Sequence, residues 1–402
     1  MVIWLNVIHN PGTHHPNDRS IASLGVRRRI DVNPIRLFET TQGSNDLGAG
    51  LPLAKLIASD ISISFSPRRC HMSSLSKVVI TDFITEPLHY ERSVLDGHAV
   101  VTALDVMSED ELLGKVEDAD ALMVYHYFHL TRKTIDRLTH CKVIVRPGVG
   151  YDGVDLEAAA ARNIPVCNVP DYGTNEVADS AMSMALSLGR GTHFLNSRLR
   201  HNRGPWSVEQ AAPIPRLTGR TFALLGCGRI GTATALRAKA FGMDVVFYDP
   251  YQCDGLDKSL GIRRVDSLEE LLRSAYILSL HCPLTEQTRM MIGKEEIAMM
   301  PEGSFLINTA RGGIVDTNSV VTALQEGRLA GAGIDVLDQE PPPADSPLLQ
   351  AWRDPDHPAH DRLILTPHSA FYCDQGAEEF RTKGAKEVLR ALQGQPLRNQ
   401  VN

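Results

Sequence analysis

"LLGCGRIGTATALRAKAFGMDVVFYDP", residues 224–250, joins an apolar strand to a helix through a glycine-rich turn. Gly226, Gly228 and Gly231 follow the apolar run "TFALL" and open the helical pattern "RIGTATALRAKAFG". Strand, G-x-G-x-x-G turn and helix in this order are typical of a dinucleotide-binding βαβ unit, whose glycines permit a tight turn and close approach of the backbone to a pyrophosphate. The segment therefore predicts a Rossmann domain that holds a dinucleotide.

The residues beside this turn indicate which dinucleotide is held. Arg229 and Ile230 open the helix, whose first N–H groups and partial positive charge suit phosphates. Asp249 ends the next predicted strand, where a carboxylate can accept hydrogen bonds from both ribose hydroxyls and repels a 2′-phosphate. NAD is therefore favoured over NADP. A glycine turn without a ligand is the alternative, but strand, helix and acid at the expected distance count against it.

The rest of the chain repeats the alternation of strands and helices. Its 402 residues are enough for two or three domains. Short β-branched runs alternate with helical patterns, which is typical of parallel sheets built from βαβ units. We expect an α/β protein with two doubly wound parallel-sheet domains. The expected division is an N-terminal extension (1–71), a smaller domain (72–176 plus 367–402) and an inserted Rossmann NAD-binding domain (177–366).

The expected elements follow from apolar periodicity and from helix caps. Strands are predicted at 78–83, 99–103, 121–125, 142–145 and 165–168, and then at 222–225, 244–248, 277–280, 304–308, 331–335 and 363–366. Helices are predicted at 108–116, 130–138, 156–162 and 176–200, the last interrupted near Gly189 and Gly191. A tail helix at 376–393 should return to the first domain, because its apolar face would otherwise have no partner.

Composition excludes several classes of partner. The 41 basic and 48 acidic residues give a formal charge of -7, which disfavours direct binding of nucleic acid. No apolar run approaches the ~18 residues of a spanning helix, and the N-terminus lacks a secretory signal, so no membrane is expected. The 7 cysteines include no C-x-x-C pair, which favours a cytoplasmic location. Residues 1–71 predict weak order, and a true start at Met72 is an equally good reading.

Three polar residues follow successive predicted strands of the second domain. Arg311 lies in "NTARGG", Glu340 in "GIDVLDQEPPP" and His368 in "LTPHSAFY". Ligands of open α/β sheets bind at the carboxyl ends of the strands, so these side chains should share one rim. Hydride transfer to a carbonyl needs a proton donor, a cation for a carboxylate and a group that keeps the donor charged. Singly each residue is a weak signal, but together they predict an active site.

From Lys77 onward the sequence resembles the D-isomer-specific 2-hydroxyacid dehydrogenases, and most of all their C-terminal binding protein branch of NAD-sensing co-repressors. The resemblance is carried by "GCGRIGTATALRAKAFGMDVVFYDPY", "LHCPLTEQT", "FLINTARGGIVD" and "TPHSAFYCDQ". It implies that the smaller, flavodoxin-like domain is the substrate (catalytic) domain. It also implies a homodimer, with contact through the long helix after Glu176.

The resemblance further implies roles for the site residues. Arg311 would bind the substrate carboxylate and polarise the carbonyl, and His368 would be the general acid and base, its pKa raised by Glu340. The N–H groups of Val149 and Gly150 would grip the carboxylate, with Gly150 keeping the approach open. Other implied contacts are His126, Arg146 and Phe371 for the substrate, Phe371 replacing the branch's Trp, and His281, Cys282, Pro283, Thr309, Ala310 and Asp335 around the nicotinamide. For Cys282 a small buried hydrophobe is an equally good reading, and no metal site is expected.

Two functions of different class remain. The first is an enzyme that reduces a small 2-keto acid with NADH or oxidises the D-2-hydroxy acid, and we favour it because binding alone needs no proton donor. The second is an NAD(H)-sensing, co-repressor-like protein that binds peptide motifs near the strand "SKVVITDF". In both, the domains would close over NAD with hinges near Val177 and Thr366. The proline-rich segment 341–362 would either cover the cleft or be solvated.

Overall fold

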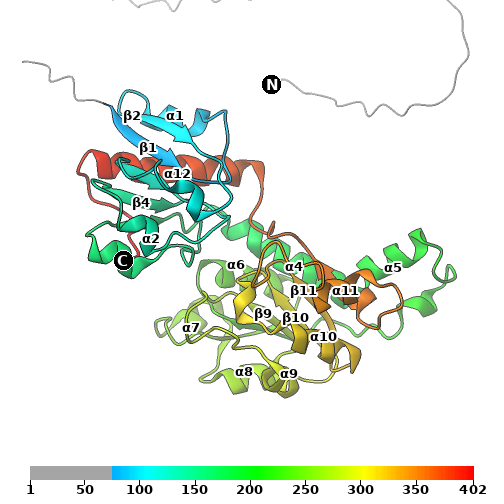
Figure 1. Ribbon diagram of the computed structural model, residues 1–402. Helices are drawn as coiled ribbons and strands as arrows, with labels where there is room; N and C mark the ends of the chain where they lie inside the picture. Colours follow the sequence, from blue (N-terminus) through cyan, green and yellow to red (C-terminus); the bar gives the residue numbers. More distant parts are fainter. Residues whose placement is uncertain (1–74) are drawn as a thin grey trace, which may run out of the picture. The chain divides into compact units, whose positions relative to one another are not determined.

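The computed structural model describes residues 75–402. The extension predicted at 1–71 lies outside the described residues. Within them the chain builds two parallel sheets, of five and seven strands. The predicted α/β class with two doubly wound sheets is confirmed (Figure 1).

The first sheet is the smaller one. It contains β1 (Ser76–Ile80), β2 (Ala99–Ala103), β3 (Ala121–Met123), β4 (Val143–Arg146) and β5 (Val166–Asn168). Their order is β2-β1-β3-β4-β5, and every pairing is parallel. This is the flavodoxin-like order, in which strand 1 lies between strands 2 and 3.

The helices around the first sheet differ in part from expectation. They are α1 (His89–Leu95), α2 (Arg132–Ile135), α3 (Leu156–Ala161) and α12 (Asp374–Leu392). The tail helix α12, red in Figure 1, packs against β3, β4 and α1, as its apolar face predicts. The helix expected at 108–116 is wrong, since only a 3₁₀ turn forms there, η1 (Glu109–Leu112). Periodicity also missed α1, whose described buried residues are only Glu91 and Leu95.

The chain's last residues run along β5. The Asn168 N–H donates to the Asn399 carbonyl at 3.1 Å, and the Val401 N–H donates to the Val166 carbonyl at 2.9 Å. The Asn402 side chain accepts from the Val166 N–H at 2.8 Å. The terminal segment therefore covers one edge of the first sheet.

The second sheet has seven strands, and the first of them in sequence lies inside the sheet. It contains β6 (Thr221–Leu225), β7 (Asp244–Tyr248), β8 (Arg263–Arg264), β9 (Ile277–Leu280), β10 (Ser304–Asn308), β11 (Leu329–Ile334) and β12 (Leu363–Leu365). The order is β12-β11-β10-β9-β6-β7-β8. The strand order reverses between β6 and β9, the position at which Rossmann folds bind a dinucleotide. The two-residue strand β8 was not predicted.

Helices and 3₁₀ turns flank this sheet. They are α4 (Thr174–Arg190), α5 (Thr192–Arg200), η2 (Val208–Ala211), α6 (Arg229–Ala240), α7 (Leu256–Leu260), α8 (Leu268–Ser274), α9 (Lys294–Met299), η3 (Gly312–Ile314), α10 (Thr317–Gln325), α11 (Pro347–Arg353) and η4 (His360–Arg362). No helix in residues 75–402 combines the length and apolarity that crossing a membrane requires.

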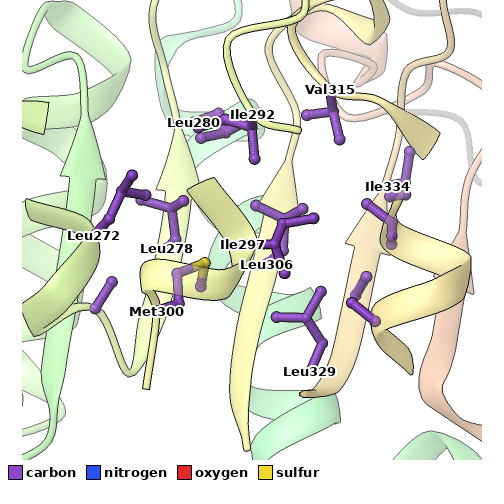
Figure 2. Packing of buried hydrophobic residues seen from close by; sticks show 14 of the residues in the cluster. Leu272, Leu278, Leu280, Ile292, Ile297, Met300, Leu306, Val315, Leu329 and Ile334 are labelled. Atoms are coloured by element: carbon purple, nitrogen blue, oxygen red, sulfur yellow. The ribbon is translucent and has the colours of Figure 1, made fainter. Parts of the chain in front are cut away.

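A large apolar core lies on one face of the second sheet (Figure 2). Leu278 and Leu306 are register partners on β9 and β10, and Ile297 at α9 packs in the same cluster. All three side chains are at most 1% exposed. Full burial of such a side chain stabilises the fold by about 1.5–3 kcal/mol. This core fixes the strand ends from which the site residues project.

The interruption predicted in the long helix occurs at one of its two glycines. The α4 helix ends at Gly191, whose φ of 68° lies in the left-handed region that favours glycine. Gly189 remains helical, and a Cβ there would lie 2.9 Å from Leu217 Cδ2. Gly189 therefore permits close packing and does not break the helix.

The proline-rich segment 341–362 neither covers the cleft nor is simply solvated. It forms α11 and η4, and Leu348 and Leu349 are buried. Asp361 accepts a hydrogen bond from Arg198 Nε at 2.7 Å, and its carbonyl lies 2.8 Å from His193 Nε2. These contacts hold the segment against α5.

Candidate active site

A cavity of about 350 Å³ is lined by residues that follow strands of both sheets. The predicted site residues that line it are His126, Arg146, Val149, Gly150, Arg229, Ile230, His281, Cys282, Pro283, Thr309, Ala310, Arg311, Asp335, His368 and Phe371. Glu340 contacts His368 without lining the cavity. Gly226, Gly228, Gly231 and Asp249 lie outside the lining, at the glycine turn.

Each glycine of the turn has its own geometric reason. Gly226 has a φ of 94°, and a Cβ there would lie 2.8 Å from the His281 carbonyl. A Cβ at Gly231 would lie 2.3 Å from the Gly226 carbonyl oxygen, so this glycine lets α6 approach β6. Gly228 has open space where its Cβ would be. The turn therefore has the shape that a pyrophosphate requires.

Asp249 lies directly against this turn. Its carboxylate accepts from the Cys227 N–H at 2.8 Å and from the Tyr251 N–H at 2.9 Å. The remaining lone pairs of the carboxylate are enough for ribose hydroxyls. Binding of a ribose by Asp249 stays a prediction that this position permits.

His368 and Glu340 form a short hydrogen-bonded pair. His368 Nδ1 lies 2.6 Å from Glu340 Oε2, and Glu340 Oε1 accepts from the Leu337 N–H at 2.7 Å. Burial raises the pKa of the Glu340 carboxyl, but the hydrogen bond and charge of His368 outweigh it and hold this pKa below its usual value. Glu340 therefore stays ionised beside the imidazole.

Asp335 organises the turn that carries His368. Its buried carboxylate accepts from the Ser369 N–H at 2.9 Å, the Ala370 N–H at 3.0 Å and the Thr366 hydroxyl at 2.5 Å. His368 has a φ of 50°, which is uncommon for a residue with a side chain. The turn is thus held by a buried acid in a conformation that it would otherwise rarely adopt.

Arg311 is paired across the cavity with an acid that sequence reasoning missed. Its Nε donates to Asp152 Oδ1 at 3.0 Å, and its NH1 donates to the Ala310 carbonyl at 2.7 Å. Burial raises the pKa of Asp152, but Arg311 outweighs it and lowers this pKa overall. The signal available in the sequence was an acid just after the "RPGVG" loop.

The glycines of that loop make room for two guanidinium groups. A Cβ at Gly148 would lie 1.7 Å from Arg146 NH1, and a Cβ at Gly150 would lie 1.3 Å from Arg311 NH2. Gly150 therefore leaves room for the Arg311 guanidinium, and the binding of a carboxylate by its N–H group stays a prediction. Burial lowers the pKa of Arg146, and within residues 75–402 no ion pair involves its guanidinium.

His126 lies beside the pair of His368 and Glu340. Its Nε2 is 3.7 Å from Glu340 Oε2, and its ring centroid is 4.5 Å from that of His368. Burial, followed by the charges of His368 and Arg146, lowers the pKa of His126 to about 4. His126 is therefore neutral at pH 7.

The loop that bears His126 is held by Asp82, another acid that sequence reasoning missed. The buried Asp82 carboxylate accepts from the N–H groups of Tyr125 at 2.8 Å and Tyr127 at 2.7 Å, and also from the His126 N–H. Asp82 follows β1, whose neighbour β3 leads into this loop. Its only sequence signal was an acid shortly after a strand.

The residues predicted around the nicotinamide show whether the site suits a bound dinucleotide. Thr309 lines the cavity, and its buried Oγ1 has no hydrogen-bond partner among residues 75–402. Burial lowers the pKa of His281 to about 3 and raises that of the Cys282 thiol to about 11, so both are neutral. Ser279 Oγ lies 2.9 Å from His281 Nε2. With the open space at Gly228, the free hydroxyl fits a bound dinucleotide.

Aromatic rings form one wall of the cavity. Phe371 contacts Tyr172, Phe380 and His368 with ring centroids 6.0, 6.4 and 6.1 Å apart. The Tyr125 and Phe380 ring centroids are 5.9 Å apart, and the buried Tyr125 hydroxyl has no hydrogen-bond partner in the described part of the chain. The wall is apolar beside His368.

A family model described as "D-isomer specific 2-hydroxyacid dehydrogenase, NAD binding domain" matches residues 182–370. The chain belongs to the D-isomer specific 2-hydroxyacid dehydrogenase family. The matched segment contains the glycine turn, Arg311, Glu340 and His368. The prediction of NAD as the cofactor is confirmed.

Two curated relatives and one solved structure illustrate the similarity. The chain is 36% identical to the D-3-phosphoglycerate dehydrogenase of Methanocaldococcus jannaschii over 79% of its length and 59% of the relative's. It is 32% identical to C-terminal-binding protein 1 of Caenorhabditis elegans over 86% of this chain and 47% of that relative. The structure of Aquifex aeolicus D-lactate dehydrogenase with NAD and lactic acid matches with a TM-score of 0.70 and 29% identity, over 79% of this chain and 96% of that one. The chain spans about half the length of the curated relatives.

Proposed function

We propose that this protein is an NAD-dependent dehydrogenase that reduces a small 2-keto acid and, in reverse, oxidises the D-2-hydroxy acid. The observation that carries the proposal is the 2.6 Å pair of His368 and Glu340 in the same site as Arg311. A structure that only bound NAD would need no ionised partner for a cavity-facing histidine. The similarity to a D-3-phosphoglycerate dehydrogenase and to a D-lactate dehydrogenase supports the same class of reaction.

Each residue has a defined part in this reaction. The nicotinamide, when bound, supplies or accepts the hydride. Arg311 and Arg146 bind the substrate carboxylate, together with the N–H groups of Val149 and Gly150. His368 gives its Nε2 proton to the carbonyl oxygen during reduction and takes it back during oxidation. Glu340 stabilises the imidazolium and fixes its orientation through Nδ1.

A substrate panel tests the proposal. The full chain would be mixed with NADH and pyruvate, glyoxylate, hydroxypyruvate or phosphohydroxypyruvate, and NADH absorbance followed. We expect turnover of at least one acid and its loss in His368→Ala. A wild-type protein that turns over none of them, or a variant that turns them over equally well, would contradict the proposal.

A second candidate is NAD(H)-dependent binding of peptide motifs. The identity to a C-terminal-binding protein over 86% of the chain favours it. A Pro-Leu-Asp-Leu-Ser type peptide on beads, offered to the protein with and without NADH, separates the two functions. Retention that depends on NADH would support binding, and no retention in either state would discard it.

Assembly and location are part of the same proposal. We expect a homodimer that uses α4 and α5, because α5 has no buried residue within the described chain. Light scattering at micromolar concentration would give twice the chain mass of 44.2 kDa. We also expect a cytoplasmic location, which fractionation of cells would test.

A further inference from the structure

His126, Glu340 and His368 form a cluster of three ligating side chains. One ring nitrogen of His126, one ring nitrogen of His368 and a Glu340 carboxylate oxygen all lie within 4.8 Å of one another. Their side chains are 28%, 20% and 27% exposed, so the cluster is accessible without being a surface patch. The dehydrogenase reaction as proposed needs only two of these groups. The third, His126, is held in place by the clamp of Asp82 on its backbone.

The chemistry of the three groups is that of a transition-metal site. Two imidazoles and one carboxylate suit Zn²⁺, Co²⁺ and Fe²⁺, whereas Mg²⁺ and Ca²⁺ prefer oxygen ligands alone. Zinc bonds of about 2.0–2.2 Å in a tetrahedron separate neighbouring ligand atoms by about 3.3 Å. The 3.7 Å between His126 Nε2 and Glu340 Oε2 is close to this value. The 2.6 Å of the His368–Glu340 pair would have to lengthen, which rotation of the Glu340 carboxylate permits.

We propose that His126, Glu340 and His368 bind a divalent transition-metal ion such as Zn²⁺, and that this ion and catalysis exclude each other. Water or the substrate carboxylate would complete the coordination. The metal bonds replace the hydrogen bond between His368 and Glu340, and any proton held between them is released to solvent.

The charges around the cluster set the expected strength of binding. Arg311 is neutralised by Asp152 at 3.0 Å, so that it opposes a cation only weakly. Arg146 has no such partner in residues 75–402 and disfavours a second positive charge nearby. We therefore expect binding in the micromolar range, weaker than that of a dedicated structural zinc site.

The inhibitory consequence rests on the proposed function, whereas metal binding does not. With a metal on Nδ1, the His368 imidazole can no longer become an imidazolium. Loss of its remaining Nε2 proton would leave an imidazolate, so His368 becomes a far weaker acid toward the carbonyl oxygen. Zinc should therefore stop reduction of the keto acid without displacing NAD. The site would sense free transition metal by the same groups that carry the proton.

Cobalt titration of the full chain, with no NAD added, tests the site directly. Co²⁺ gives visible absorption bands in a site of low coordination number, so binding is read without any activity measurement. We expect His126→Asn and Glu340→Gln each to weaken this signal by at least the 10–100-fold that loss of an outer-shell partner costs. His129→Asn is the matched control, since His129 is exposed in the same loop and should leave the titration unchanged.

Zinc inhibition of NADH oxidation gives the second readout. Inhibition by Zn²⁺ should be reversed by a chelator, absent with Mg²⁺ and weaker by the same factor in His126→Asn. Cobalt or zinc binding that is equal in the wild type and in both variants would overturn the metal site, while leaving the dehydrogenase untouched. Absence of turnover with every keto acid would overturn the proposed function, and the cobalt titration would still decide the metal site.

Discussion

The two sheets use the same device to present a histidine, with different results. On the first sheet the buried Asp82 follows β1, and its carboxylate accepts hydrogen bonds from the N–H groups of the loop that bears His126. On the second sheet the buried Asp335 follows β11 and holds the turn that bears His368. His368 lies 2.6 Å from Glu340, whereas His126 lies 3.7 Å from it. Each buried carboxylate therefore places a histidine through the backbone, but only His368 lies within hydrogen-bond distance of Glu340.

The largest effect is expected for His368→Ala. Loss of a general acid lowers kcat by about 10²–10⁴-fold. His126→Ala should cost far less, because the neutral His126 supplies no proton at pH 7. Steady-state kinetics of the two variants with the best keto acid of the panel would measure this. Equal losses in both would erase the distinction between the two histidines.

The glycine loop offers a matched pair of smaller effects. Gly150→Ala places a Cβ 1.3 Å from Arg311 NH2, and Gly148→Ala places one 1.7 Å from Arg146 NH1. Each guanidinium must move, so we expect KM to rise by about 10- to 200-fold, the range that a few kcal/mol of lost binding gives. Circular dichroism would show whether the variants remain folded. An unchanged KM in both variants would remove the two arginines from carboxylate binding.

Neutralising the buried carboxylates of Asp82 and Asp335 in turn compares the two sheets directly. Asp335→Asn and Asp82→Asn each turn one carboxylate oxygen into an N–H donor that faces other donors. Each should destabilise the protein by about 1–3 kcal/mol. Only Asp335→Asn should also lower kcat strongly, since it loosens the turn of His368. Urea unfolding would measure the loss of stability, and steady-state kinetics on the same samples would measure kcat. Equal kcat losses in the two variants would contradict the expected difference between them.

The pH dependence of stability should report His126. Its folded pKa of about 4 lies below its ordinary value of 6.5, so the unfolded chain binds more protons between these values. Stability therefore falls as pH drops through this window, by on the order of 1–3 kcal/mol. His126→Asn should flatten this part of the curve, measured by urea unfolding at pH 7 and pH 4.5. A curve as steep as that of the wild type would assign the effect to other groups, such as His281.

Strong local patterns made most of the fold predictable. Strands 99–103, 244–248, 277–280 and 304–308 match the structure residue for residue, because each is a short, mostly apolar run between helical patterns. The 3₁₀ turn η1 was overpredicted as a helix, since a cap followed by acids is a local signal and says nothing of packing.

The sequence motifs predicted which residues share the site. They did not predict the acids that hold those residues in place. Arg311, Glu340 and His368 follow strands, so their meeting at one rim follows from parallel topology. Asp152 and Asp82 could not be assigned, because their partners lie far along the chain and only the folded sheets bring them together. The close approach of Arg311 to Gly150 could not be predicted for the same reason, since the two residues come from different sheets.

The terminal segment along β5 limits where another chain can add a strand to the first sheet. Strand edges with free N–H and C=O groups are templates for intermolecular pairing and aggregation. Residues 399–402 already occupy those groups on β5. A partner that extends this sheet by strand addition would therefore have to dock along β2, the opposite edge, where Val100 is 53% exposed.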